Sequence, residues 1–249
     1  MENFIFNEND ISQHIVRYGV DIRPPIVPKQ EKEKLQSYCN WLIEQFPEAF
    51  ETLLSGPEKT IVQKTFLAGG NKRIELPTFA MTRRGPLYTF PVRFLVQNAE
   101  DFDIPARNKI FRSAIDKLKE TFVSKIVRVG VVHEIIFDCG SINPVEIIAS
   151  AMSKERWREG LRNIRIHLEN PENGYNINID LAPAYAQQVI QSPGGTKRKS
   201  IGFGISVKLD INNQKMTEEL DKDMVAAILA FAEDYVPDKL VGFLNNERS

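Results

Sequence analysis

Apolar side chains recur along the chain with two spacings, and each spacing predicts one kind of element. Around residues 35–46 and 110–122 they recur every three or four positions, which is the spacing of a helix that buries one face. Around residues 88–96 and 126–137 they alternate with other residues, which is the spacing of a strand. The two spacings together predict an α+β chain.

The predicted elements fall into two halves with the same order: a strand, a helix, three strands and a second helix. Residues 1–124 form the N-terminal half and residues 125–249 the C-terminal half, and we expect them to pack as one compact unit. Three neighbouring strands favour antiparallel sheets with helices packed on one face. The expected elements are strand 15–22, helix 30–46, a helical turn to residue 54, strands 60–68, 72–81 and 87–96, a helix from Pro105, strand 126–137, a helix from Pro144, strands 163–169, 175–182 and 200–211, and a helix from Thr217.

Alternation in the second half divides its three neighbouring strands into an apolar and a polar face. The apolar face is expected to line the core. The other face is either a solvated surface or a docking platform, but it lacks the row of aromatic residues on which an RRM-type protein stacks bases. Its polar positions include Arg165, His167, Glu169, Asn176, Asn178, Asp180, Ser206, Lys208 and Asp210.

Composition limits the classes of function. Of the 249 residues, 42% are apolar and 26% are charged, which is typical of a folded protein and excludes a disordered or disulfide-rich chain. The 32 basic and 33 acidic side chains give a net charge of -1. Because nucleic-acid-binding domains are usually basic overall, any such contact must come from a local patch.

The sequence also bears on the compartment. It has neither the basic start and apolar run of a secretory signal nor the roughly 20 apolar residues that span a bilayer. Cys39 and Cys139 lie in different predicted elements and form no Cys-x-x-Cys pair. We therefore expect a cytoplasmic protein with two reduced thiols and no membrane contact.

No motif of a common enzyme occurs. The zinc, calcium, Walker, dinucleotide and nucleophile-elbow patterns are absent, so we expect no metal and no cofactor. His133 lies among apolar residues and is interpreted as a hydrogen-bonded core residue. His14 lies near the start of the chain with no evident partner. His167, on the polar face near Arg165 and Glu169, is either a surface histidine or a catalytic base.

Two segments concentrate positive charge. Residues 192–204 combine glycines with three consecutive cations, and we interpret them either as a loop that binds phosphate or the RNA backbone or as a soluble hairpin connection. Residues 154–165 hold further cations, and the two segments would form one anion-binding surface if they lie together. The candidate nucleic-acid or anion-binding residues are Gly194, Gly195, Lys197, Arg198 and Lys199 in the first segment and Arg158, Arg162 and Arg165 in the second.

The first basic segment, Gly194-Gly195 followed by Lys197-Arg198-Lys199-Ser200-Ile201-Gly202-Phe203-Gly204, resembles the glycine-rich loop of CRISPR-associated repeat-processing endoribonucleases. This resemblance implies two ferredoxin-like halves, a loop that grips RNA and a histidine base. It covers this short segment only. In that family the loop lies near the C-terminus, whereas a predicted helix follows it here.

The layout of the whole chain is similar to that of a sporadically distributed family of uncharacterised bacterial proteins. The shared features are Pro24-Pro25-Ile26-Val27, a helix that ends at Phe46-Pro47, the strand with Arg128-Val129-Gly130, and Leu209-Asp210-Ile211 before a final helix with Phe231. The segment Arg-Val-Gly-Val-Val-His departs from the Arg-x-Gly-x-Arg-Tyr pattern of that family. The resemblance implies no known activity, and the patchy occurrence of the family implies a mobile-element or phage-defence role.

Three hypotheses of function follow. The first is a cytoplasmic binding or accessory protein of a bacterial defence system, without catalysis of its own. It would contact a protein partner or a second copy of itself through the polar sheet face or the basic glycine-rich segment. The second is an RNA-binding endoribonuclease. The third is a small-ligand-binding protein with a pocket between sheet and helices.

Overall fold

One antiparallel sheet of nine strands forms the centre of the computed structural model, which describes residues 5–55, 60–63, 77–81, 85–94, 104–152, 163–192, 195–214 and 218–245. The strands are β1 (Ile11–Arg23), β2 (Thr52–Ser55), β3 (Thr60–Gln63), β4 (Thr78–Met81), β5 (Pro86–Phe94), β6 (Lys125–Asp138), β7 (Ile166–Glu172), β8 (Tyr175–Ser192) and β9 (Gly195–Asn213). Their order in the sheet is β2-β3-β4-β5-β1-β6-β9-β8-β7. Strands of both halves of the chain therefore belong to one sheet, joined by the pairing of β1 with β6.

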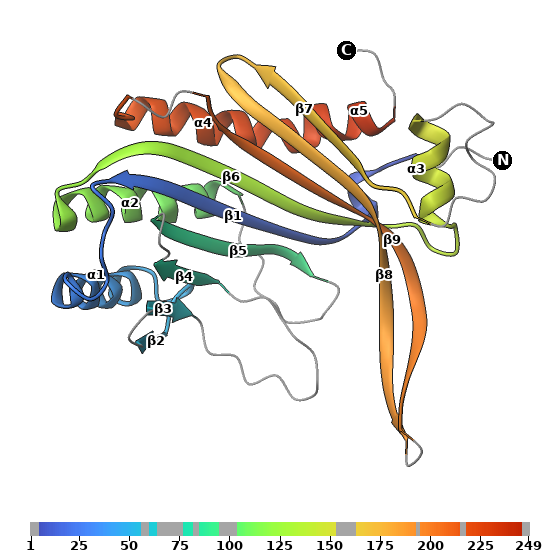
Figure 1. Cartoon of the computed structure of the whole chain (residues 1–249), viewed down its shortest axis with the longest axis horizontal. Helices are drawn as coiled ribbons and strands as arrows, with labels where there is room; N and C mark the ends of the chain where they lie inside the picture. The colour runs from blue at the N-terminus through green and yellow to red at the C-terminus, as the bar shows by residue number, and fades with distance from the viewer. Residues whose placement is uncertain are drawn as a thin grey trace.

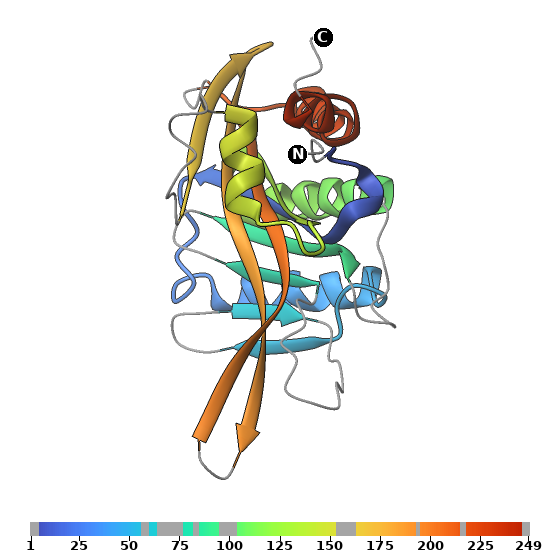
Figure 2. The ribbon, with the colours of Figure 1, turned by 90° about the vertical axis from the view of Figure 1, so that its right-hand side faces the viewer.

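Helices α1 (Lys32–Gln45), α2 (Ile104–Phe122) and α4 (Lys222–Asp234) cover one face of this sheet (Figures 1 and 2). Helix α3 (Pro144–Met152) packs against β8 and β9 at one end. The short helices η1 (Glu8–Asp10), η3 (Tyr235–Leu240) and α5 (Val241–Leu244) lie near the termini. The predicted α+β fold, with helices packed on an antiparallel sheet, is confirmed.

The connection after α1 differs from the prediction. A helical turn was expected up to residue 54, but Thr52–Ser55 form strand β2, which pairs with β3. Leu53 packs against the core from the strand, opposite the buried Val62. In the first half, four strands therefore follow α1, whereas three follow α3 in the second half. The pseudo-repeat and the boundary at residue 124 stay predictions, and the expected Gly69–Asn71 turn lies outside the described residues.

A group of polar side chains is buried between the central strands and helices α2 and α4. His14 Nε2 lies 3.0 Å from His133 Nδ1, and the two residues are 5% and 1% exposed. Arg107 on α2 is fully buried nearby. Burial and the charge of Arg107 lower the pKa of His14 to about 3. Burial, then His14 and Arg107, hold the pKa of His133 well below its ordinary value. The interpretation of His133 is confirmed, but His14 does have a partner, because β1 pairs with β6.

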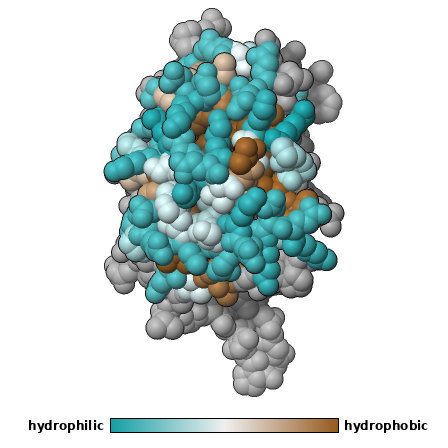
Figure 3. Space-filling view, turned by 90° about the vertical axis from the view of Figure 1, so that its left-hand side faces the viewer, coloured by the Kyte–Doolittle hydropathy of each residue, from teal (hydrophilic) through white to brown (hydrophobic). Residues whose placement is uncertain are grey.

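The surface at one end of the molecule is mainly hydrophilic, and both cysteines are buried. Hydrophilic side chains cover most of the end at which α2 stops and α4 begins, with hydrophobic atoms in small patches between them (Figure 3). Both Cys39 and Cys139 are buried free thiols. Among the described helices, none has the length and apolar character that crossing a membrane requires.

Candidate functional site

The sheet face turned away from α1, α2 and α4, here called the open face, carries the polar positions of the central strands. On β8, Ile177, Ile179 and Leu181 are buried against the core, whereas Asn178 and Asp180 are partly exposed. The predicted division of these strands into an apolar and a polar face is therefore confirmed. The open face also extends onto β1 and β6, where the sequence pattern had not placed a site.

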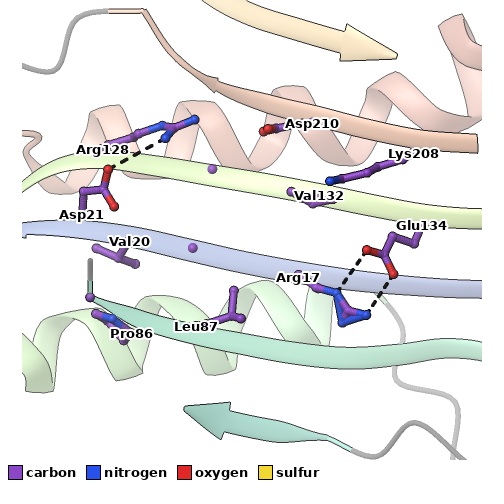
Figure 4. Close-up of a pocket in the computed structure, with 13 residues that line it drawn as sticks. Arg17, Val20, Asp21, Pro86, Leu87, Arg128, Val132, Glu134, Lys208 and Asp210 are labelled. Atoms are coloured by element: carbon purple, nitrogen blue, oxygen red, sulfur yellow. Dashed lines mark hydrogen bonds and ion pairs between the residues drawn. The ribbon is translucent and has the colours of Figure 1, made fainter. Parts of the chain in front are cut away.

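Two ion pairs cross between β1 and β6 on the open face (Figure 4). Arg17 donates from Nε and Nη2 to the two carboxylate oxygens of Glu134, at 3.3 and 2.9 Å. Arg128 Nη1 lies 3.8 Å from Asp21 Oδ2, too far for a hydrogen bond. The Nε of Arg128 is shielded from solvent and has no hydrogen-bond partner among the described residues. Arg17 is therefore held by both carboxylate oxygens of Glu134, whereas Arg128 keeps an N–H group that can still donate a hydrogen bond.

Two glycines face each other between these ion pairs. Gly19 of β1 is the register partner of Gly130 of β6, with Leu87 of β5 and Asn212 of β9 on either side. A hollow of about 270 Å³ lies over them, here called the glycine notch. Besides these two glycines, its lining includes Arg17, Asp21, Leu87, Arg128, Val132, Glu134, Lys208 and Asp210.

The backbone does not require glycine at either position of the notch. A Cβ on Gly19 would meet its nearest neighbour, Leu87 Cδ1, at 4.0 Å, and one on Gly130 would meet Asn212 Cβ at 3.6 Å. Both are ordinary contact distances, so a side chain would fit. By contrast, a Cβ on Gly204 would lie 2.7 Å from the Phe137 carbonyl oxygen, so that glycine is needed for packing. Glycine inside a strand weakens the strand and often marks a close approach of a ligand or another backbone.

A second hollow of about 240 Å³ adjoins the notch and shares Glu134 and Lys208 with it. Lys208 is exposed on β9 and forms no ion pair with the described residues. The charges of the open face nearly cancel across the two hollows and the adjoining edge of the sheet. They are five carboxylates (Asp21, Glu134, Glu169, Asp180, Asp210) and four permanent cations (Arg17, Arg128, Arg165, Lys208).

His167 lies at the β7 edge of the open face with both ring nitrogens occupied. Its Nδ1 is 2.9 Å from Asp180 Oδ1 and its Nε2 is 3.1 Å from Glu169 Oε1. These hydrogen bonds, that to Asp180 first, raise the pKa of His167 above its usual value. An imidazole bound by two carboxylates is favoured in its charged form and has no free nitrogen to accept a proton. The catalytic role of His167 stays a prediction, and this geometry favours an anchored surface cation.

The described residues of the basic segment, 192 and 195–204, belong to two paired strands, as in a hairpin. β8 and β9 pair as far as Ser192 and Gly195, and Lys197, Arg198 and Lys199 have Ile190, Val189 and Gln188 as register partners. The pairing of β7 with β8 ends at Leu181 of β8, and the pairing of β6 with β9 ends at Gly204 of β9. Residues 183–192 and 195–203 therefore leave the sheet as a two-stranded arm, here called the β arm (Figures 1 and 2).

The two basic segments are not brought together at Arg165, the one member of the second segment within the described residues. Its guanidinium lies 3.7 Å from Asp180, which is separated from Gln188, the partner of Lys199, by eight residues of β8. At ~3.4 Å per residue this is roughly 27 Å. The register therefore does not place Arg165 beside Lys199, and the anion-binding role of these residues stays a prediction. Gly194, Arg158 and Arg162 lie outside the described residues.

Sequence reasoning missed the glycine notch, although one pattern points to it. The triplets Arg17-Tyr18-Gly19 and Arg128-Val129-Gly130 repeat the order arginine, apolar residue, glycine on two strands. In a strand, the first and third positions share a face, so each triplet places an arginine and a glycine together. Only the pairing of β1 with β6 makes the glycines neighbours.

The comparisons with known proteins add no relative. No family model matches the chain, and no curated protein matches its sequence.

Within the described ranges, no group of three or more histidine, cysteine or acidic side chains could hold a metal ion. The site must therefore be interpreted from its own geometry.

Proposed function

We propose that the chain is a binding protein without catalysis of its own, and that its open face receives part of a partner protein. The observation that carries this proposal is that Gly19 and Gly130 lie side by side on the open face at positions where a larger side chain would fit. Because strand glycines weaken a sheet, two of them facing each other at its centre favour an occupant over a purely structural role. The defence assembly implied by the whole-chain resemblance would be the setting of such a recognition subunit.

The chemistry of the open face supports a protein over a nucleic acid as the partner. Its five carboxylates are balanced by four permanent cations and His167, so it lacks the excess of positive charge that binds a chain of phosphates. An apolar row also leads across neighbouring strands to the notch. Its members are register partners in turn, namely Leu54, Ile61, Ala80 and Leu87, and Leu54 is 48% exposed. Apolar area surrounded by polar groups is typical of protein interfaces.

Photocrosslinking in the cell of origin tests this proposal. With p-benzoylphenylalanine in place of Lys208, which lies on the open face, we expect a discrete adduct that protease removes and nuclease does not. The same group in place of Met224, which is 45% exposed on α4, should give no such adduct. Gly130→Val fills the notch and should weaken the adduct about tenfold, the effect of losing one important interface contact.

The controls distinguish specific binding by the open face from non-specific crosslinking. Ala182→Val adds similar bulk on the open face beside the second hollow and should leave the adduct within about twofold of wild type. An adduct of equal strength from both crosslinker positions, or one that nuclease removes, contradicts binding of a protein by the open face. Crosslinking of purified protein to itself identifies a second copy as the partner.

Nucleic-acid binding by the β arm is a second candidate function. Residues 181–209 contain no acidic residue but four cations, Lys197, Arg198, Lys199 and Lys208. Among the described residues, the ladder pairs of the arm join its own two strands, and at its base Cys139 N donates to the Phe203 carbonyl oxygen at 2.9 Å. A two-stranded ribbon fits the major groove of B-form DNA, whereas the deep and narrow major groove of RNA does not admit it. The arm therefore favours duplex DNA over the RNA substrate of the repeat-processing hypothesis.

Fluorescence anisotropy with labelled DNA and RNA duplexes tests this second function. Replacing Lys197, Arg198 and Lys199 by alanine should lower DNA affinity at least tenfold at low salt and reduce the slope of log K against log salt by roughly 2.7, about 0.9 for each lost phosphate contact. Replacing the exposed Lys29, Lys32 and Lys34 removes equal charge elsewhere and should change affinity little. Equal losses in both triple variants indicate only a net-charge effect.

A further inference from the structure

The floor of the glycine notch is flat backbone. Gly19 and Gly130 are register partners, so two neighbouring strands expose their peptide groups side by side. Leu87 and Asn212 continue the same row on β5 and β9. A flat floor bounded by side chains best matches a flat occupant, because a ring lying on it contacts both backbones at once. Aromatic rings laid over strand glycines compensate in this way for missing side chains.

The walls of the notch combine apolar side chains with a guanidinium, and both suit an aromatic side chain. Leu87 and Val132 line it with apolar surface, which suits the edge of a ring. Arg128 borders it with a guanidinium whose Nε lacks a hydrogen-bond partner among the described residues and whose Nη1 is 3.8 Å from Asp21. In this wall position the guanidinium meets the edge of a ring that lies on the floor, where its N–H groups can donate to an oxygen carried by the ring.

The rim also offers acceptors for a polar group on the ring. The carboxylates of Asp21 and Asp210 line the notch, and Asp210 Oδ1 accepts one hydrogen bond from Asn212 Nδ2 at 3.1 Å. A phenol O–H or an indole N–H would find an acceptor there, whereas an aliphatic side chain would use only the apolar walls.

We propose that the glycine notch receives one tyrosine or tryptophan side chain of the partner protein, with its ring on the backbone of Gly19 and Gly130. This inference rests on the proposed function and names the group that the open face recognises. The volume of about 270 Å³ is below the usual range for whole ligands and is suited to one large side chain. Aromatic anchors in a central pocket with a polar rim carry much of the binding energy of protein interfaces.

Amide-detected NMR titration of the whole chain with small probes tests this inference. The probes are N-acetyl-tyrosinamide, N-acetyl-tryptophanamide and N-acetyl-leucinamide. We expect saturable shifts of the Gly19, Gly130 and Val132 amides with the two aromatic probes, and affinity for the leucine probe at least about fivefold lower. Gly130→Val should abolish the shifts, whereas Ala182→Val, in the neighbouring hollow, should leave them unchanged.

A second variant keeps the test valid if Gly130→Val fails to fold. Gly19→Ala adds one carbon at 4.0 Å from its nearest neighbour and should lower the aromatic affinity about fivefold. Equal affinity for the leucine probe, shifts that persist in Gly130→Val, or no shifts at the notch would overturn the inference. If crosslinking through position 208 succeeds while the aromatic probes fail, the open face still binds a partner and only the aromatic anchor is wrong.

Discussion

Lowering the pH from 7 to 5 is expected to remove about 2 kcal/mol or more from the free energy of unfolding, because two buried imidazoles remain neutral in the folded chain. In the unfolded chain a histidine has a pKa near 6.5. In the folded chain, burial and Arg107 lower the pKa of His14 to about 3, and burial, His14 and Arg107 lower that of His133. Below pH 6.5 the unfolded state therefore binds more protons than the folded state. The stability is full above pH 6.5 and falls as the pH drops toward the folded pKa, by about 2 kcal/mol at pH 5 for His14, and His133 adds to this loss.

Urea unfolding at pH 7, 6 and 5 measures this loss. His133→Gln keeps a hydrogen-bonding side chain but removes one titrating group, so the loss between pH 7 and 5 should fall to about half. His14→Gln provides the same test from the other strand. The raised pKa of His167 has the opposite effect, because it stabilises the folded chain as the pH falls. His167→Asn removes this imidazole, so that the effect of the two buried histidines can be measured alone. An unchanged pH dependence in both glutamine variants would show that other groups control acid unfolding.

Gly204→Ala should destabilise the chain by about 1–3 kcal/mol, the usual cost of forcing extra atoms into a packed site. The new Cβ would lie 2.7 Å from the Phe137 carbonyl oxygen and 3.0 Å from Ile136 Cγ2. The first neighbour is backbone of β6, so β9 must move away from β6. Gly204 is the last residue of β9 that pairs with β6 before the β arm begins.

Gly130→Ala is the matched control, because it makes the same change on the neighbouring strand. Its Cβ would meet Asn212 Cβ at 3.6 Å, an ordinary contact. Replacing a glycine where the backbone accepts a side chain usually stabilises by about 0.4–1 kcal/mol. Thermal and urea unfolding of both variants measure the difference. If Gly130→Ala were as damaging as Gly204→Ala, the notch glycines would be needed for packing and the argument for an occupant would fail.

Much of the fold follows from local patterns. The three-to-four-residue spacing around Leu35 and Leu42 predicted α1, and alternation on residues 126–137 predicted β6 almost to its ends. These predictions succeed because burial of one face is recorded in the period of the apolar residues. Residues 52–54 were misjudged as helical, since the four residues of β2 are too few to show a period and β2 is specified by its pairing with β3.

The β arm bears on the two interpretations that the sequence left open for the basic segment, a binding loop or a hairpin connection. Glycines and cations at residues 194–204 are typical of a loop, but each strand of the arm supplies the backbone partners of the other. Pairing of this kind satisfies the backbone groups regardless of side-chain type. The position of the candidate cations on a projecting ribbon could therefore not be deduced from their identity.

The sequence by itself determined the α+β class, the main helices and the division of the strands of the second half into an apolar and a polar face. Only the tertiary structure decided that β1 lies beside β6, so that Gly19 faces Gly130, Arg17 reaches Glu134 and His14 meets His133. The physical reason is that periodicity acts over neighbouring residues, whereas register joins positions more than a hundred residues apart. Pairing of that kind is set by the packing of the whole sheet and its helices, and it assembles the glycine notch from two strands that lie far apart in the sequence.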